Sequence, residues 1–296
     1  MLFCSLVRIF AIKSISMHQP FTINVQGKLL VLDKPVVMGI LNATSDSFFS
    51  SSRVAGESVV ERARKMLDDG AAILDVGACS TRPGSVPVSA AEELRSLHAV
   101  LEKLDKEFPA AVVSVDTFRG EVALECARNH NVSIINDVSG FEWDSAMFNA
   151  VVQLKKTYVL THSMGCAGDV AEYTDFIPEV LGKLARKMWQ LHQEGVADVI
   201  VDPGFGFGKS LEQNFMMLAA LREFAMLDAP LLVGVSRKSM ITRLLGVSAQ
   251  DALPGTVALN MAALLNGASI LRVHDVKEAV QAVRLSQALK GDLKEL

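Results

Sequence analysis

The chain has 296 residues, of which 50% are hydrophobic and 21% are charged, and its formal net charge at pH 7 is -4. This length suits one large α/β barrel or two ordinary domains, and the apolar share is enough to form a large core. A mildly acidic chain lacks the basic surface typical of nucleic-acid binding, so we expect no nucleic-acid partner.

Cysteine usage and the first residues bear on location. The sequence has four cysteines without a CxxC spacing, at Cys4, Cys79, Cys126 and Cys166. This pattern indicates neither a disulfide framework nor a structural zinc site, and a reduced cytoplasmic setting is the simplest interpretation. Residues 1–16 are apolar, but Arg8 interrupts the run, which is shorter than the roughly 20 residues of a membrane span. We expect a disordered extension before Met17, with a targeting segment as the alternative, and no membrane contact.

Short apolar segments alternate with longer amphipathic ones along the rest of the chain. Residues 22–32 are typical of a hairpin that turns at Gln26-Gly27. Strands are then predicted at 36–41, 72–77, 111–115, 133–135, 157–161, 199–201, 230–235 and 269–273. Helices are predicted at 57–69, 89–107, 120–129, 177–194, 211–227, 256–265 and 276–289.

Eight such βα repeats favour a (β/α)8 TIM barrel over an open doubly wound sheet. The sequence has no Pro/Ser-rich linker and no low-complexity tract, so we expect a single α/β domain over residues 17–296. The N-terminal hairpin would close the floor of this barrel.

Polar residues follow most of the predicted strands: Asn42, Asp116, Asn136, Asp202, Lys238, Arg272 and His274. The carboxyl ends of the strands meet at one rim of a barrel, where active sites are built. Asp116, Asn136 and Asp202, with Lys238, suit the edge of a flat, nitrogen-rich heterocycle. Arg272 and His274 are two positions apart, so on a strand they face the same side and could hold one anion.

The segment from Val199 to Lys209 combines a buried apolar strand, the carboxylate of Asp202 and a glycine-rich loop. A Lys-Ser pair after glycines suggests a phosphate-binding P-loop, but Pro203 occupies the position that needs the first glycine. We therefore favour a ligand-binding loop at the barrel rim, and the alternative is a turn without chemical use.

Two further loops are long and polar, as functional barrel loops often are. The loop over residues 42–52 is rich in serine, and the loop over residues 77–84 carries Ser80, Thr81 and Arg82 between glycines. Cys79 lies beside the second loop, but no histidine is placed to act as its base, so a nucleophilic cysteine is disfavoured. His162 also ends a predicted strand, and we expect it to be a scaffold residue.

Seven motifs in order carry a family resemblance. They are MGILNATSDSF (38–48), DVGACSTRPG (75–84), SVDTFRGEVA (114–123), INDVSG (135–140), DPGFGFGK (202–209), GVSRKSM (234–240) and RVHDV (272–276). The chain resembles the dihydropteroate synthases, the pterin-binding barrels of folate biosynthesis, over about residues 22–290. The resemblance implies a transferase that condenses 6-hydroxymethyl-7,8-dihydropterin diphosphate with 4-aminobenzoate, giving 7,8-dihydropteroate and diphosphate.

The resemblance also assigns roles to residues. Asp116, Lys238, Arg272 and His274 would be catalytic. The substrates would be held by these four and by Thr81, Arg82, Asn136, Asp202, Phe207 and Ser239. Asn42 would help to hold Mg²⁺, and a homodimer sensitive to sulfonamides would be expected.

Three departures from the family pattern fall in loops. Ser45 replaces the usual proline, Cys79 stands where glutamate is common, and Thr161-His-Ser-Met replaces a Met-His-Met-type segment. A pterin-dependent methyltransferase is one alternative, although it would not need the 80–84 loop or Arg272 with His274. A catalytically silent pterin-binding barrel is another, and retention of both halves of the site argues against it.

Overall fold

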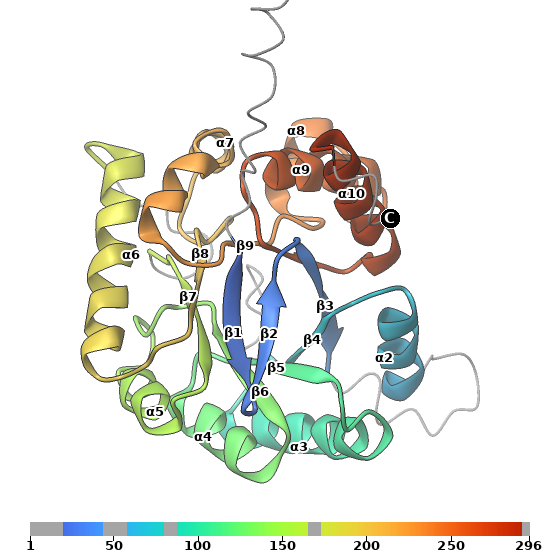
Figure 1. Ribbon diagram of the computed structural model, residues 1–296, viewed down its shortest axis with the longest axis vertical. Helices are drawn as coiled ribbons and strands as arrows, with labels where there is room; N and C mark the ends of the chain where they lie inside the picture. The colour runs from blue at the N-terminus through green and yellow to red at the C-terminus, as the bar shows by residue number, and fades with distance from the viewer. Residues whose placement is uncertain (1–19, 44–57, 80–87, 165–172, 292–296) are drawn as a thin grey trace, which may run out of the picture.

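The computed structural model describes residues 20–43, 58–79, 88–164 and 173–291. Eight parallel strands form a barrel surrounded by helices (Figure 1). The strands are β3 (Val36–Asn42), β4 (Ile73–Gly77), β5 (Val112–Asp116), β6 (Val132–Asp137), β7 (Thr157–Thr161), β8 (Val199–Asp202), β9 (Leu232–Val233) and β10 (Ile270–Val273). Their order is β8-β7-β6-β5-β4-β3-β10-β9, and a parallel bridge between Val201 and Leu231 joins the two ends. The predicted TIM barrel is confirmed.

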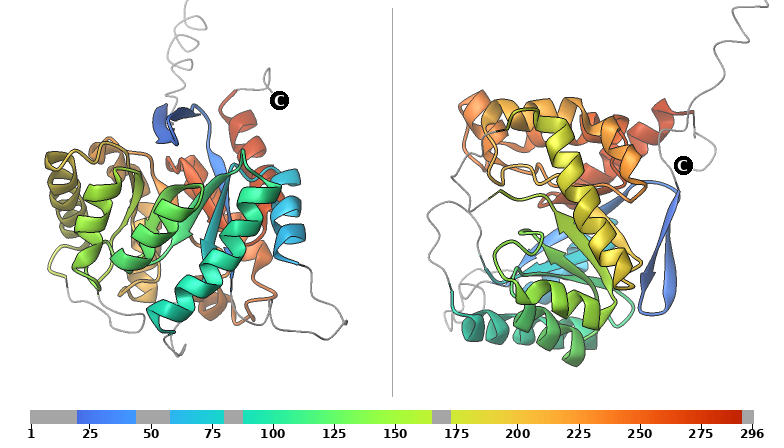
Figure 2. Two further views of the ribbon diagram at one scale, coloured as in Figure 1. Left: turned by 90° about the horizontal axis from the view of Figure 1, so that it is seen from below. Right: turned by 90° about the vertical axis from the view of Figure 1, so that its left-hand side faces the viewer.

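The helices lie on the outside of the sheet in all views (Figures 1 and 2). They are α2 (Val59–Asp68), α3 (Ala90–Glu107), α4 (Gly120–Asn129), α5 (Ala146–Leu154), α6 (Phe176–Gln193), α7 (Leu211–Ala219), α8 (Ser239–Leu245), α9 (Leu253–Leu265) and α10 (Val276–Leu289). Ser58, Ser89 and Ser210 begin three of them with complete capping boxes. None of the helices in the described ranges is long and apolar enough to cross a bilayer.

The N-terminal hairpin closes the barrel at the amino ends of its strands. It consists of β1 (Phe21–Val25) and β2 (Lys28–Leu32), joined through Gln26 and Gly27, which both have positive φ. Such a turn matches the twist of paired strands. The hairpin packs its apolar face on one inward residue from each of seven strands, in a cluster of Ile23, Val25, Leu32, Met38, Ile73, Ile134, Val159, Ile200, Leu232 and Ile270. The predicted floor is therefore present.

Some element predictions were wrong in detail. Residues 211–227 do not form one helix: α7 ends at Ala219, and the 3₁₀ helix η2 (Leu221–Leu227) follows. The buried side chains Leu221 and Phe224 are three positions apart, which fits a helix with three residues per turn. Helices α5 and α8 were not predicted, since the first is apolar nearly all round and the second is only 7 residues long. The strand expected at 230–235 is reduced to Leu232–Val233.

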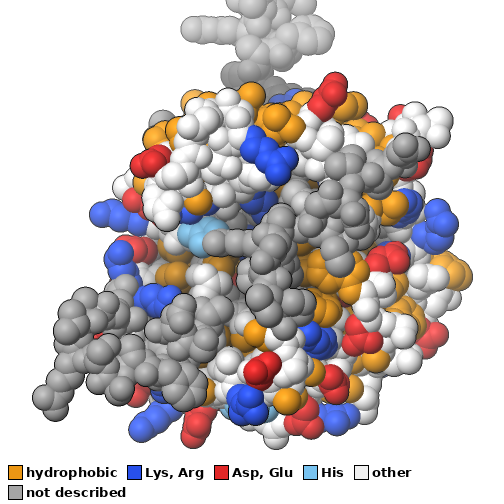
Figure 3. Space-filling view, turned by 180° about the vertical axis from the view of Figure 1, so that it is seen from behind, with side chains coloured by type: hydrophobic (Ala, Val, Ile, Leu, Met, Phe, Trp, Pro, Cys, Tyr) orange, Lys and Arg blue, Asp and Glu red, His pale blue; other side chains and the backbone are white. Residues whose placement is uncertain are grey.

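The face turned away from the view of Figure 1 is shown in Figure 3. Over its described part, acidic and basic side chains are interspersed, and a histidine lies near the centre. No broad surface of one sign is seen on this described part of the face.

Candidate active site

A polar layer lies directly above the apolar floor of the barrel. Side chains two positions apart on a strand share a face, so the residue two positions after each floor residue also points into the barrel. On six strands these positions are polar, and they are Asp75, Ser114, Asn136, Thr161, Asp202 and Arg272. All but Arg272 are buried. The barrel interior therefore changes from apolar to polar toward the carboxyl ends of its strands.

Arg272 joins two carboxylates from neighbouring strands. Its Nε donates to Oδ2 of Asp75 at 2.6 Å, and its Nη2 donates to Oδ2 of Asp116. Asn136 donates through Nδ2 to the same oxygen of Asp75 at 3.0 Å. Charge-assisted hydrogen bonds of this kind fix side chains firmly. Asp75, which was not predicted, thus links Asn136 to Arg272, and Arg272 in turn holds Asp116.

Asp75 could have been found from the sequence. Its side chain is 0% exposed although it lies in the middle of an otherwise apolar strand. A carboxylate inside a buried strand needs a cationic or hydrogen-bonding partner. Inside a barrel, that partner is an inward-facing polar residue on another strand. The strand-end pattern does not include Asp75, because this residue lies in the middle of β4.

The charges in this network alter one another. Burial raises the pKa of Asp116 to about 7, although Arg272 opposes the rise, and the negative charge of Asp75 adds to it. Burial would lower the pKa of Arg272, but the carboxylates of Asp75 and Asp116 raise it overall. Arg272 is therefore always cationic, whereas Asp116 can gain or lose a proton near neutral pH.

A glycine makes room for Asp116 at the mouth. Gly77 lies opposite Asp116 in the register of β4 and β5. A Cβ added to Gly77 would lie 3.3 Å from Cβ of Asp116, closer than ordinary side-chain contact. Substitution of Gly77 would therefore press on the carboxylate, so this position favours glycine for steric reasons.

Asp202, Lys238 and Phe207 form the second group of predicted residues. Oδ1 of Asp202 accepts a hydrogen bond from the backbone N–H of Gly204 at 2.7 Å. The ammonium of Lys238 donates to the carbonyl of Phe205 and lies 4.8 Å from the ring centroid of Phe207. Burial lowers the pKa of Lys238 to about 8, against the attraction of Asp202. These residues present a carboxylate, an amine and an aromatic face to one another.

The glycine-rich loop is held from within by Lys209. Its Nζ donates to the carbonyls of His162, Gly204 and Phe207 at 3.0, 2.8 and 3.0 Å. Gly204 has a φ of +77°, and a Cβ there would lie 1.9 Å from the carbonyl oxygen of His162. Lys209 is thus a buried structural residue, which agrees with the prediction that this segment is not a P-loop.

His274 is oriented by Ser236. The backbone N–H of His274 donates to Oγ of Ser236 at 3.2 Å, and Nδ1 of its ring lies 3.0 Å from the same oxygen. These two contacts hold the imidazole ring in place, and the proton between Nδ1 and Oγ comes from one of these two groups. Arg237 pairs with both carboxylate oxygens of Asp275, at 2.9 and 2.6 Å, and joins the loops that follow β9 and β10.

The remaining predicted residues lie at the edge of the site. Asn42 is exposed at the end of β3, and Ser239 is exposed at the start of α8. Thr81 and Arg82 lie outside the described residues. Among the residues that are described, no group of three His, Cys, Asp or Glu could hold a metal ion. Mg²⁺ commonly uses one or two protein oxygens together with waters and substrate phosphates, so the amide oxygen of Asn42 fits such a role.

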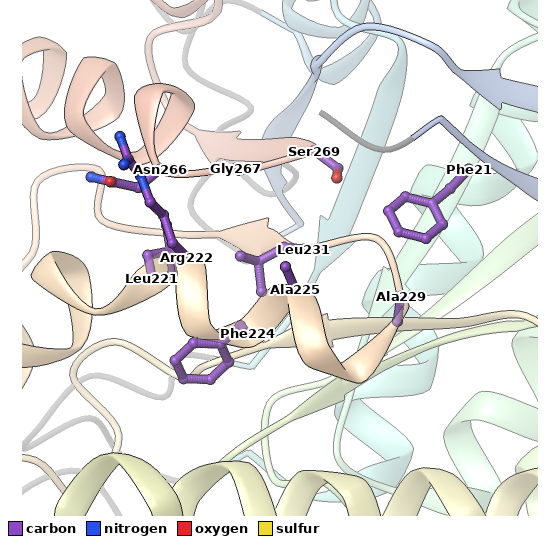
Figure 4. Close-up of a pocket in the computed structure, with 10 residues that line it drawn as sticks. All are labelled: Phe21, Leu221, Arg222, Phe224, Ala225, Ala229, Leu231, Asn266, Gly267 and Ser269. Atoms are coloured by element: carbon purple, nitrogen blue, oxygen red, sulfur yellow. The ribbon is translucent and has the colours of Figure 1, made fainter. Parts of the chain in front are cut away.

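A separate cavity lies at the other end of the barrel. It has a volume of about 230 Å³ and lies between the hairpin residue Phe21, helix η2 and the starts of β9 and β10 (Figure 4). Phe21, Phe224 and Leu231 make its walls largely apolar, with Arg222 and Asn266 at one end. None of the predicted site residues lines this cavity.

Comparison with known proteins agrees with this geometry. The profile of the family described as "Pterin binding enzyme" matches residues 38–274. The chain belongs to this family. It is 40% identical to dihydropteroate synthase of Escherichia coli over 269 residues, which cover 89% of this chain and 94% of the relative. The predicted resemblance to dihydropteroate synthases is confirmed.

Solved structures of this pterin-binding family share the fold. Dihydropteroate synthase of Yersinia pestis, in a complex with a sulfonamide drug, has a TM-score of 0.83 and 35% identity, and the match covers 92% of this chain and 100% of that one. The Xanthomonas albilineans enzyme with 4-aminobenzoic acid has a TM-score of 0.82 and 36% identity, over 92% and 99% of the two chains. Full-length coverage shows that the whole barrel, and not one motif, is shared.

Proposed function

We propose that the chain is a dihydropteroate synthase that joins 6-hydroxymethyl-7,8-dihydropterin diphosphate to 4-aminobenzoate, releasing diphosphate. This is the folate-pathway transferase activity predicted from its sequence, and the full-length relatives carry that name. The observation that supports it most directly is the buried pairing of Arg272 with Asp75 and Asp116 beside Asp202 and Lys238. It provides charged groups for two tasks at the carboxyl end of the barrel.

The first task is to bind the pterin. A flat heterocycle with several ring nitrogens is selected by paired hydrogen bonds from fixed donors and acceptors. Asp116, Asn136 and Asp202 supply acceptors, and Lys238 supplies a donor. Phe207 offers an aromatic face beside the Lys238 ammonium. Arg272 would lie over the ring face, since its guanidinium is planar and held at both ends.

The second task is to stabilise the departing diphosphate. His274 and Arg272 would donate to its oxygens, and Thr81, Arg82 and Ser239 would order around it and around the aminobenzoate carboxylate. Asn42 would help to hold Mg²⁺, which when bound neutralises charge on the diphosphate. Charge that develops in a transition state is best stabilised by groups that are already oriented, and the Ser236 bonds provide this for His274.

The order of bond changes follows from the reactants. The bond between the pterin methylene carbon and the diphosphate oxygen breaks, and its electron pair leaves with the diphosphate. The amine nitrogen of aminobenzoate then bonds to the cationic methylene carbon, and the resulting ammonium loses a proton to the released diphosphate or to water. Aminobenzoate is a weak nucleophile, so formation of the cation limits the rate, and the carboxylate of Asp116 stabilises that positive charge. No general base is proposed.

The test is diphosphate release by purified protein supplied with the pterin diphosphate, Mg²⁺ and 4-aminobenzoate. Release should require aminobenzoate and should fall at least a hundredfold in Asp116→Asn and in Arg272→Ala. If wild-type protein binds the pterin but releases no diphosphate, the chain is a pterin-binding barrel and not a synthase.

We also propose that residues 17–296 act as one catalytic domain, that the protein is cytoplasmic, and that it is inhibited by sulfonamides.

A homodimer is proposed as well. Exposed apolar side chains lie on the helices α7, α8 and α10, at Met216, Leu244, Leu245, Leu285 and Leu289, each at least 46% exposed. Burial of such a group between two copies would be favourable. Sedimentation equilibrium should give twice the mass of one chain, and Leu285→Lys should shift it toward a monomer.

A further inference from the structure

A second charged pocket lies at the carboxyl end of the barrel. It has a volume of about 450 Å³ and opens between helix α6 and the loops that follow β6 and β7. We call it the rim pocket, and it is lined by Glu142, Ser163, Met164, Lys183, Arg186, Lys187 and Gln190. None of these residues belongs to the proposed catalytic site.

The rim pocket lies across the barrel mouth from the diphosphate end of that site. In the closed strand order, β6 and β7 stand opposite β3 and β10. Asn42 ends β3, and Arg272 and His274 belong to β10 and its following loop. A ligand in the rim pocket would therefore not occupy the same position as the leaving group.

Positive charge dominates the lining of this pocket. Lys183, Arg186 and Lys187 are spaced i, i+3 and i+4 on α6, so they lie on one face of the helix. Lys187 pairs with Glu142 at 2.5 Å and donates to the carbonyl of Gly140 at 2.7 Å. Glu142 is the single carboxylate among the described lining residues. Glu142 balances the charge of Lys187, and the charges of Lys183 and Arg186 are left without a carboxylate in the lining.

The ammonium of Lys183, a half-buried side chain, makes two weak contacts. Its Nζ donates to Sδ of Met164 at 2.9 Å and lies 5.3 Å from the ring centroid of Tyr173. A thioether is a weak acceptor, and an aromatic face contributes about 0.5–2 kcal/mol. Oε1 of Glu179, one turn earlier, accepts from the backbone N–H groups of Thr174 and Asp175, and the charge of Glu179 also interacts with that of Lys183. An anion would be a far stronger partner for Lys183 than Met164.

Unsatisfied polar atoms lie behind this lysine. His162 precedes Ser163 of the pocket wall, is 4% exposed, and neither ring nitrogen has a hydrogen-bond partner. The hydroxyl of Tyr173, whose ring lies 6.3 Å from that of His162, is also unpartnered. Burial lowers the pKa of His162 to about 2, helped by Lys209, Lys183 and Lys187, so the ring is neutral. Buried polar groups without partners are rare, and an ordered water or ion is one explanation for them.

We propose that the rim pocket is a second anion site, which binds a phosphate or diphosphate group. Lys183 and Arg186, which lie beside the Lys187–Glu142 pair, are better satisfied by an anion with several oxygens and more than one charge than by a single carboxylate. If the proposed function holds, two sources of this group are at hand: the pterin diphosphate and the released diphosphate. Binding there would hold either one at the mouth of the barrel.

The experiment follows the methyl signal of Met164 in protein labelled with ¹³C-methyl methionine, assigned through Met164→Leu. Inorganic diphosphate without Mg²⁺ is added to the wild type, to Lys183→Ala/Arg186→Ala, and to the matched pair Lys277→Ala/Arg284→Ala on α10. Saturable movement of the Met164 signal is expected in the wild type and in the α10 variant. In the α6 variant the affinity should be at least tenfold weaker, with an unchanged circular dichroism spectrum.

Further arms separate the possible ligands. Arg272→Ala/His274→Ala weakens the catalytic anion site, and the response of Met164 should persist in it. The pterin diphosphate and inorganic diphosphate are titrated separately, which shows which source the pocket takes. Equal affinity in the α6 variant and the wild type, or an equal response to 4-aminobenzoate, would overturn the anion site. Failure of the proposed function would instead appear as absence of aminobenzoate-dependent diphosphate release, whatever Met164 does.

Discussion

Asn136 donates its Nδ2 proton to Oδ2 of Asp75 at 3.0 Å, deep in the barrel. The bond decides which end of the amide is turned toward Asp75, so the carbonyl end is turned away from it. A carboxylate can only accept, and this excludes the flipped amide. Asp75 therefore acts as a positioning residue: it presents Asn136 to the ligand as an acceptor and holds Arg272 by its Nε.

Replacement of Asp75 by asparagine should lower kcat/KM for the pterin diphosphate by about 10- to 100-fold, because hydrogen bonds to charged groups contribute about 1.5–3 kcal/mol. The variant removes the charge that holds Arg272 and allows the Asn136 amide to flip. Steady-state kinetics at saturating aminobenzoate measures the change. Ser114→Ala is the matched control, since Ser114 lies beside Asp75 in the sheet register and its Oγ has no partner. Equal activity of the two variants would refute the positioning role.

Loss of Arg272 should destabilise the fold as well as the site. Arg272→Met leaves Asp75 and Asp116 without their shared cation, and removal of one partner of a buried ion pair costs about 3–5 kcal/mol. Urea unfolding at neutral pH measures the free energy. Arg237→Met removes a more exposed pair with Asp275, in which the arginine side chain is 29% exposed. The second variant should lose clearly less stability, and the opposite order would contradict the buried network.

The activity should depend on the charge of Asp116. Its pKa is raised to about 7, mainly by burial, so the carboxylate is lost as the pH falls below that value. Because the proposed reaction needs this negative charge, kcat/KM should fall toward acid pH with a midpoint near 7. The contribution of Asp116 to the stability of the fold changes with pH in the opposite direction. The raised pKa favours the folded state at acid pH, fully below the ordinary value of 3.8, and that contribution is lost as the pH rises through about 7.

The same titration tests the influence of Asp75. The negative charge of Asp75 contributes to the raised pKa of Asp116. Asp75→Asn should therefore move the acid limb of the pH profile to lower pH, in addition to lowering the rate. A profile that moves to higher pH, or that stays in place, would show that another group controls the limb.

Lys209 should matter for folding of the loop and not for binding of diphosphate. Lys209→Met leaves three buried carbonyls without their donor, at a cost of about 1–3 kcal/mol for each unsatisfied group. We expect lower thermal stability and a raised KM for the pterin, measured by calorimetry and kinetics. Diphosphate affinity should change less than threefold. A selective loss of diphosphate binding at unchanged stability would revive the P-loop interpretation.

The sequence alone predicted the architecture and the rim of the site. Eight apolar strands alternating with amphipathic helices encode a barrel, because burial on both faces requires such runs at such spacing. Asp116, Asn136, Asp202 and Arg272 could be placed at strand ends for the same reason. Local patterns are weaker where elements are short or uniformly apolar, so they do not predict α5 and α8, and they predict a single helix over residues 211–227.

The contacts within the site were decided only by the tertiary structure. Asp75 and Arg272 are 197 residues apart, and closure of the barrel brings them to 2.6 Å. Nothing in the sequence near Lys209 shows that its ammonium points into its own loop and not at a ligand. The rim pocket likewise needs α6 and two separate loops to meet. Periodicity determines which face of an element is buried, but partners across a barrel depend on the closure and register of the whole sheet.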